Sequence, residues 1–268
     1  MIPLKDENPT RRRPIVTLAI IVACIGIYFV WQPSPFSDSV ADVDFAVRRA
    51  AIPCEIVQGE PLTVDELRAT YQLGREEACG VGSDDSQVGY PDKSVWASIL
   101  VSMFLHGSVV HLAGNLLFLW IFGNNIEDHL GRLRFIVFYV VGGIVATLTY
   151  VALNPDSTIG MVGASGAIAA VMGAYFVWFP DAPVRTWISF LLFVVVRIRA
   201  KWVLGFWFVL QFFTTPNSGV AWAAHVGGFV FGVLVGLLVR ASGTARRAMW
   251  RAGHRGDAWD PTGGAGYG

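Results

Sequence analysis

The sequence predicts an all-α polytopic membrane protein: a bundle of six transmembrane helices with a folded outer first loop. The 268-residue chain is 54% hydrophobic and only 15% charged, which is too apolar for an ordinary soluble enzyme. Its apolar residues form long runs, and its charged residues gather in blocks between those runs. The formal net charge is zero, so the overall charge gives no indication of a nucleic-acid partner, and none is expected.

Six apolar runs are candidate spans. A crossing needs roughly 20 residues at 1.5 Å each. By that measure the first, third, fourth and sixth runs are comfortable in length, and the second and fifth are short. The runs are Ile15–Trp31, Val109–Phe122, Phe135–Leu153, Met161–Phe179, Trp202–Phe213 and Val220–Val239.

Two further apolar stretches, Trp96–Leu105 and Trp187–Val196, suit segments that lie at the membrane interface better than spans. Joining the second stretch to the fifth run would place Arg197, Arg199 and Lys201 inside one helix. Each charge costs about 2.5–3.5 kcal/mol near the bilayer centre. Two separate segments are therefore expected.

The distribution of Lys and Arg predicts the orientation. With six spans, the segments on one face carry 15 of the 20 basic residues, and the positive-inside rule makes that face cytoplasmic. We therefore expect a plasma membrane protein with both termini cytoplasmic. A cleaved signal peptide is the alternative for the first run, but that run is long and no small-residue cleavage site follows it. The expected division is a basic tail (1–13), a membrane domain (14–240) that contains the outer loop (32–95), and a disordered cytoplasmic tail (241–268).

The outer loop has signs of a folded cap. Thr63 and Glu66 have capping-box spacing ahead of a helical stretch that runs to about Glu76. Cys54 and Cys79 lie on the oxidising side of this topology and are candidates for a disulfide. Two free thiols remain the alternative, because pairing cannot be read from sequence.

Polar residues inside the spans are functional hypotheses by default. His111 and Asn115 lie in the first two turns of the second span, Ser165 near the start of the fourth, and His225 near the start of the sixth. All three of these helices begin on the outer face. The four side chains are therefore expected at one depth, in the outer part of the bilayer.

Small residues indicate that the fourth and sixth helices touch, because small side chains let membrane helices approach closely. Close approach is what a serine nucleophile needs, since its hydroxyl must hydrogen-bond a base at about 2.6–3.2 Å. Such stripes are also common as plain packing in membrane bundles. The small residues are Gly166, Ala169, Ala170, Gly173 and Ala174 on one helix, and Ala224, Gly228, Gly232 and Gly236 on the other.

Attack on a peptide carbonyl also needs hydrogen-bond donors aimed at the developing oxyanion. His111 and Asn115 are four residues apart, so they share a helical face, and both can donate. The backbone N–H of Ser165 is a third candidate, near the positive end of a helix dipole.

These motifs resemble the rhomboid family. The segment HGSVVHLAGN contains His106, His111 and Asn115, the segment GASG spans Gly163 to Gly166, and AHVGGFVFG surrounds His225. The resemblance covers roughly Trp96 to Val239. It implies a rhomboid-like bundle, the serine endopeptidase activity of the family, and single-span membrane proteins as substrates.

The resemblance also implies residue roles. Ser165 would be the nucleophile, His225 the general base and acid, and His111 and Asn115 the oxyanion donors, while His106 would be structural. It further implies that the fifth helix gates substrate access from the lipid. Gly163, Gly166, Ala224 and Gly228 complete the set of expected site residues as structural members.

The chain departs from one family pattern, because some rhomboids carry a Tyr one turn after the serine that stacks on the base, and Ala169 stands there here. No Asp or Glu lies within the six predicted spans, so we expect a dyad rather than a triad. Asp156, in the third loop, is the nearest outer alternative. His129 and His254 are expected to be solvated.

Other classes fit less well. A membrane zinc protease should show H-E-x-x-H, which is absent, and Ala167 breaks the G-x-S-x-G pattern of an α/β-hydrolase. No cofactor or metal is expected. A rhomboid-like protein that binds client helices without cutting them, or a small transporter with a histidine relay, is the alternative function. The oligomeric state and the physiological substrate cannot be read from the sequence.

Overall fold

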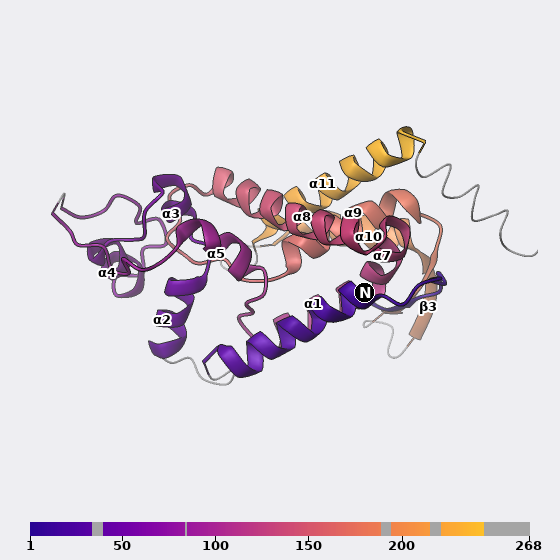
Figure 1. Cartoon of the computed structure of the whole chain (residues 1–268), viewed down its shortest axis with the longest axis horizontal. Helices are drawn as coiled ribbons and strands as arrows, with labels where there is room; N and C mark the ends of the chain where they lie inside the picture. The colour runs from indigo at the N-terminus through magenta and orange to yellow at the C-terminus, as the bar shows by residue number, and fades with distance from the viewer. Residues whose placement is uncertain (34–39, 84, 189–193, 215–220, 244–268) are drawn as a thin grey trace, which may run out of the picture.

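The computed structural model describes residues 1–33, 40–83, 85–188, 194–214 and 221–243. Six helical segments form the membrane bundle, a group of short helices caps one end, and a small sheet lies at the other end (Figure 1). The six segments are α1 with η1 (Ile15–Gly26, Ile27–Trp31), α6 with η2 and α7 (Val109–Phe118, Leu119–Gly123, Asn124–Leu130), α8 (Arg132–Leu153), α9 (Ser165–Trp178), α10 (Ala200–Gln211) and α11 (Trp222–Ala241).

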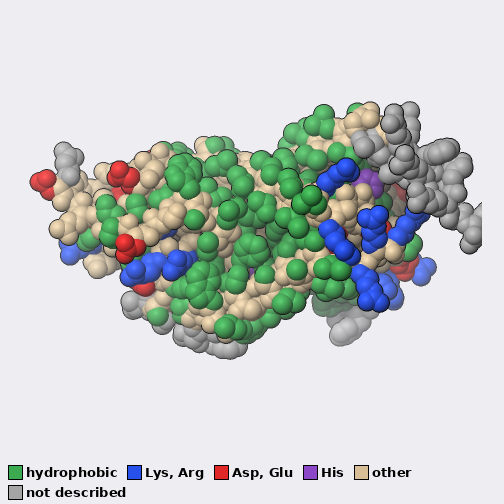
Figure 2. Space-filling view, viewed as in Figure 1, with side chains coloured by type: hydrophobic (Ala, Val, Ile, Leu, Met, Phe, Trp, Pro, Cys, Tyr) green, Lys and Arg blue, Asp and Glu red, His purple; other side chains and the backbone are tan. Residues whose placement is uncertain are grey.

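By length and composition, three helices among the described residues could each cross a membrane alone: Val109–Leu130, Arg132–Leu153 and Trp222–Ala241. The helices at Ile15–Trp31 and Ser165–Trp178 are apolar but shorter. Green apolar side chains cover the middle of the molecule, and blue basic side chains gather at the sheet end (Figure 2). This pattern fits a protein whose middle lies in lipid.

Two predicted span boundaries were wrong. The second span does not end at Phe122 but continues to Leu130, so it is not short. The fourth does not begin at Met161 but at Ser165, and its 14 residues make it a short helix of about 21 Å. A positive φ of 130° at Gly163 keeps the residues before Ser165 out of the helix.

The second helix continues because its buried acidic residue, Glu127, finds hydrogen-bond donors on another helix. Glu127 is buried, and its carboxylate accepts hydrogen bonds from the backbone N–H of Val16 (3.0 Å) and from the N–H and hydroxyl of Thr17 (2.8 Å each). The first N–H groups of a helix have no partner within it, so Glu127 caps α1. Counting apolar residues along the sequence cannot detect this contact, so it ends the span too early.

The sheet was not predicted. It comprises β1 (Ile2–Asp6), β2 (Pro183–Ile188) and β3 (Val194–Arg199), paired antiparallel in that order. The Trp187–Val196 stretch, expected to lie at the interface, thus contributes to β2 and β3, with 189–193 outside the described residues. β3 ends at Arg199 and α10 begins at the next residue, which confirms that these segments are not one helix.

Asp6 at the end of β1 fixes the amino-terminal strand to the bundle. Its buried carboxyl group accepts hydrogen bonds from Asn125 Nδ2 of α7 (2.5 Å) and from the Tyr175 hydroxyl of α9 (3.0 Å). Burial raises the pKa of Asp6. The residues expected to form a basic tail therefore pack against the helices.

The cap is folded, as the sequence predicts. It contains α2 (Val40–Arg49), α3 (Pro53–Gln58), α4 (Val64–Tyr71) and α5 (Val95–Ser102). The Thr63–Glu66 capping box is present at the start of α4, but that helix ends at Tyr71 rather than near Glu76. The Trp96–Leu105 stretch forms most of α5, which is too short to span a bilayer.

The cap core contains a buried ion pair between Lys93 and Glu55, whose side chains are each 1% exposed. Lys93 also donates to Val47 O at 2.6 Å, and Glu55 accepts from Leu62 N at 3.1 Å. Burial raises the pKa of Glu55 and lowers that of Lys93. The pair therefore joins the α2 and α3 segments to the chain that leads into α5.

Replacing Lys93 with methionine should destabilise the cap by about 3–5 kcal/mol, because it leaves the Glu55 carboxylate buried without its partner. Thermal unfolding together with limited proteolysis of the cap would measure this. Arg48→Met is the matched control, since Arg48 pairs with Asp44 at the surface and exposed pairs contribute little. Equal stability of the two variants would contradict a structural role for the buried pair.

Candidate functional site

Ser165 is the first residue of α9, and its side chain is half-buried. Its backbone N–H therefore belongs to the first turn of a helix, where N–H groups lack partners within the helix. The loop that leads to it is fixed by a hydrogen bond from Gly163 N to Ser102 O of α5 (2.9 Å). The short α9 thus begins inside the bundle, with the candidate nucleophile at its end.

Gly163 lies between Ser165 and His111. A Cβ atom at Gly163 would lie 2.9 Å from both Cε1 and Nε2 of the His111 ring and 3.6 Å from Ser165 Oγ. The backbone φ of 130° also favours glycine. The structure therefore brings Ser165 and His111 together, as the sequence predicts, and leaves no room for a side chain between them.

The helices α9 and α11 approach closely at this level. A Cβ at Gly228 would lie 2.2 Å from Gly166 O, and one at Gly166 would lie 3.9 Å from Ala224 O. Gly166 follows Ser165 in the chain, and Ala224 precedes His225. Ser165 and His225 therefore occupy facing turns of two helices in backbone contact, which confirms that the fourth and sixth helices touch.

No hydrogen bond joins the Ser165 hydroxyl to the His225 ring within the described part of the chain. Hydrogen bonds between catalytic groups commonly tighten only when a substrate binds. The geometry makes Ser165 and His225 neighbours, without the hydrogen bond that would activate the serine.

His225 is held by α10. Its Nδ1 lies 2.7 Å from Oε1 of Gln211, and its ring centroid is 5.7 Å from that of Trp207. The Trp207 ring therefore packs against the His225 ring, whereas Ala169 on α9 has no aromatic ring to do so. Gln211 and Trp207 were missed in the sequence, although a lone Gln in an apolar span is a signal of the same kind as the histidines.

Two buried nitrogen atoms, one on α6 and one just before it, have no hydrogen-bond partner among the described residues. They are Nδ2 of Asn115, on a side chain that is 7% exposed, and Nε2 of His106, which is 1% exposed. Buried polar groups without partners are rare in folded proteins, and the NH2 of an amide can only donate. The Asn115 amide is therefore available to donate to a group that is not part of this chain.

His106 is placed by its surroundings. Gln32, just after the first span, accepts from His106 N (3.0 Å) and donates to His106 O (2.9 Å). The imidazole Nδ1 lies 3.2 Å from Phe104 O, and the ring packs edge-on against His111 at 5.2 Å. The His106 ring thus packs against the His111 ring, and Gln32 is a further residue that the sequence did not reveal.

A small cavity adjoins Ser165. Its lining includes Gly143 and Ala146 of α8 and Gly166 and Ala167 of α9. Small lining residues leave room for a small side chain next to the nucleophile.

In the oxyanion role that the resemblance implies for Asn115, Asn115→Ala is expected to lower turnover by about 10²-fold or somewhat less, since losing one such donor costs a few kcal/mol and other donors remain. Steady-state cleavage with KM determined separately would measure it. Because Nδ2 of Asn115 has no hydrogen-bond partner among the described residues, thermal stability should change little. Unchanged turnover would remove Asn115 from the site.

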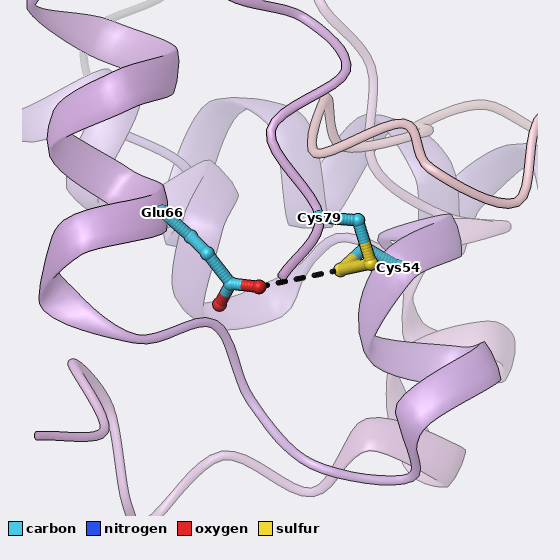
Figure 3. Close-up of side chains that lie close together, drawn as sticks. All are labelled: Cys54, Glu66 and Cys79. Atoms are coloured by element: carbon cyan, nitrogen blue, oxygen red, sulfur yellow. Dashed lines mark hydrogen bonds between the residues drawn. A yellow bond between two sulfur atoms is a disulfide. The ribbon is translucent and has the colours of Figure 1, made fainter. Parts of the chain in front are cut away.

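Only one group among the described residues has the donor types for a metal, and it lies in the cap: Cys54, Glu66 and Cys79 (Figure 3). The structure pairs Cys54 with Cys79 as a disulfide, with Cα atoms 5.6 Å apart, and disulfide sulfurs are not thiolate ligands. Glu66 is already engaged by Thr63 N (2.7 Å) and Gly80 N (2.7 Å). This cluster fits a cross-linked cap rather than a metal centre.

His129 differs from its expected state. Its ring is half-buried, 4.3 Å from the Trp178 ring and 5.8 Å from Phe179, because α7 continues the second helix and packs against the end of α9. His129 is therefore not a solvated loop residue. His254 lies outside the described residues, and Asp156 lies in the loop between α8 and α9.

The candidate site lies inside a helical bundle that suits a membrane, where serine, histidine and asparagine side chains occur on neighbouring helices. The comparisons show the family: the Rhomboid domain family matches residues 93–242. The chain belongs to the Rhomboid family.

Three relatives illustrate the similarity. Presenilin-associated rhomboid-like protein A, mitochondrial, of Danio rerio is 32% identical over 50% of this chain and 35% of its own length. Rhomboid protein 1, mitochondrial, of Saccharomyces cerevisiae is 33% identical over 52% of this chain and 40% of its own. Rhomboid-related protein 2 of Mus musculus is 32% identical over 56% and 50%. The chain thus spans half or less of these relatives.

Proposed function

We propose that this protein is a serine endopeptidase that cleaves the transmembrane segments of single-span membrane proteins through a Ser165–His225 dyad. The observation that carries the proposal is the contact of α9 with α11 at Gly166 and Gly228. It brings the turns that bear the hydroxyl and the imidazole face to face, as an activated serine requires.

The proposed chemistry has Ser165 as nucleophile and His225 as base and acid. His225 accepts the Ser165 proton as Oγ attacks the substrate carbonyl carbon, and the tetrahedral oxyanion is stabilised by Asn115, His111 and the Ser165 N–H. His225 then donates its proton to the leaving amine, and the peptide bond breaks to give an acyl-enzyme. Water, deprotonated by His225, then attacks the acyl carbon; the bond to Ser165 Oγ breaks, His225 returns the proton to that oxygen, and the acid product is released. The small cavity beside Ser165 favours substrates with small residues near the cut.

The test is a cleavage assay of the full chain in liposomes against candidate single-span proteins, with cut positions mapped by mass spectrometry. Cuts within or at the edge of the membrane segment are expected. A folded protein that binds such segments and leaves them intact would instead be a non-cutting member of the family. Transport of an ion without cleavage would favour the histidine-relay alternative.

We also propose that the sheet end faces the cytoplasm in a plasma membrane. Basic side chains concentrate there (Figure 2), including Arg185, Arg197 and Arg199 of the sheet, and such residues are retained on the cytoplasmic side. The Cys54–Cys79 disulfide then lies on the oxidising side. Reporters fused to either terminus should be active only in the cytoplasm. Activity on the outer face would show that the orientation is the opposite of the one proposed.

A further inference from the structure

Gln211 is the last residue of α10 and is buried, with 6% of its surface exposed. Its side-chain amide joins two groups. Nε2 lies 2.8 Å from the carbonyl oxygen of Trp207, one turn earlier, and Oε1 lies 2.7 Å from Nδ1 of His225 on α11. A polar side chain from the fifth helix thus contacts the candidate base directly.

The Trp207 carbonyl fixes which way the amide points. A carbonyl oxygen only accepts hydrogen bonds, so the group 2.8 Å from it must be the NH2 of Gln211. The opposite amide orientation would place two acceptors against each other. The amide oxygen of Gln211 therefore faces His225.

This orientation sets the tautomer of His225. An amide oxygen cannot donate, so Nδ1 of His225 must carry the proton and donate it to Gln211. The neutral ring then has its lone pair on Nε2. A general base at Ser165 needs that form, in which one nitrogen is anchored by a donated hydrogen bond and the other is free to accept a proton.

We propose that Gln211 is a positioning residue that holds His225 in the Nδ1–H tautomer, so that Nε2 can serve Ser165. The assignment rests on the proposed protease function. The Trp207 ring beside His225 comes from the same helix, so α10 supplies both restraints where Ala169 supplies none. Displacement of α10 would release the base, which couples the position of this helix to the reactivity of the serine.

The test measures fluorophosphonate labelling of Ser165 and steady-state cleavage by the full chain in detergent. Gln211→Leu keeps a similar volume and removes the acceptor, so labelling and kcat should fall about 10- to 100-fold with little change in KM, less than the roughly 10⁴-fold seen when a triad aspartate is neutralised. Val209→Ala, an exposed position on the same helix, is the matched control and should behave as wild type.

Gln211→Glu keeps an acceptor oxygen for Nδ1 but gives up the hydrogen bond to the Trp207 carbonyl, so its labelling should be faster than that of Gln211→Leu and slower than that of wild type. A carboxylate also stabilises the imidazolium, so the acidic limb of the kcat/KM profile should move to higher pH. Among the described residues, His111 of α6 is the titratable group that also interacts with His225, and it is unchanged in these variants. A role in packing alone would not move the pH profile.

Equal labelling of wild type and Gln211→Leu would overturn the assignment and leave the protease function standing. The assignment would also be overturned if Gln211→Leu and Gln211→Glu were labelled equally slowly and the Glu variant had the kcat/KM pH profile of wild type. If Gln211→Leu fails to fold, the pH profile of the Glu variant decides by itself. A folded wild-type protein that is never labelled would overturn the protease function and this assignment with it.

Discussion

Replacing Ser165 or His225 with alanine is expected to abolish both fluorophosphonate labelling and substrate cleavage, a loss of up to about 10⁶-fold in kcat. An unassisted hydroxyl is a poor nucleophile near neutral pH, so each member of the dyad is needed. The losses should not add in the double variant, because residues that act as one unit are strongly non-additive. In-gel fluorescence and single-turnover cleavage would measure both.

Ser98→Ala is the matched control for this experiment. Ser98 is a buried serine on α5 whose hydroxyl donates to Val95 O at 2.6 Å, so its loss tests for general damage to a packed serine. It should retain labelling and cleavage. If Ser165→Ala still cut a single-span substrate at the wild-type position and rate, the serine-protease proposal would be wrong. The alternative of a small transporter with a histidine relay would then be favoured.

Gly228→Val should reduce both activity and stability. A Cβ at Gly228 would lie 2.2 Å from Gly166 O, and that backbone atom cannot move aside without moving α9. Overpacking typically costs about 1–3 kcal/mol, and a shift of roughly 1 Å between reacting groups can cost about 10²-fold in rate. Thermal unfolding and kcat should therefore fall together, with Gly228→Ala showing a smaller effect of the same sign.

Gly26→Ala tests whether the close approach, rather than glycine as such, is responsible. Gly26 is helical at the end of α1, and a Cβ there would meet nothing within 4 Å. Alanine favours helix by up to about 1 kcal/mol over glycine, so this variant should be at least as stable as wild type and fully active. A Gly228→Val protein with normal kcat would show that the dyad does not depend on this contact.

The approach of Ser165 to His111 could be predicted from sequence because it follows from chain topology. In a six-span protein the even-numbered helices all begin on one face, so polar residues near their starts share a depth. Small residues on two helices predicted the contact of α9 with α11 for an equally general reason. Neither inference required knowledge of a particular side-chain contact.

The missed features depend on contacts between distant segments. The second span was predicted to end at Phe122 because Glu127 is a charged residue in the sequence. Only the structure shows that Val16 and Thr17 donate hydrogen bonds to its carboxylate. Apolar counts could not separate a strand from an interfacial segment in Trp187–Val196, because a short apolar run fits both. Gln211 was overlooked because the rule applied to His, Ser and Asn within spans was not extended to Gln.

The sheet orders the steps of biosynthesis. Among the described residues β1 (Ile2–Asp6) pairs with β2 (Pro183–Ile188) alone, so about 180 further residues must be made before β1 has a partner. Translation at about 5–20 residues per second makes that interval roughly ten to forty seconds. The amino end of α1 likewise stays uncapped until Glu127 has been made. β1 and the amino end of α1 are therefore among the parts that can reach their final structure only after much of the bundle has been made.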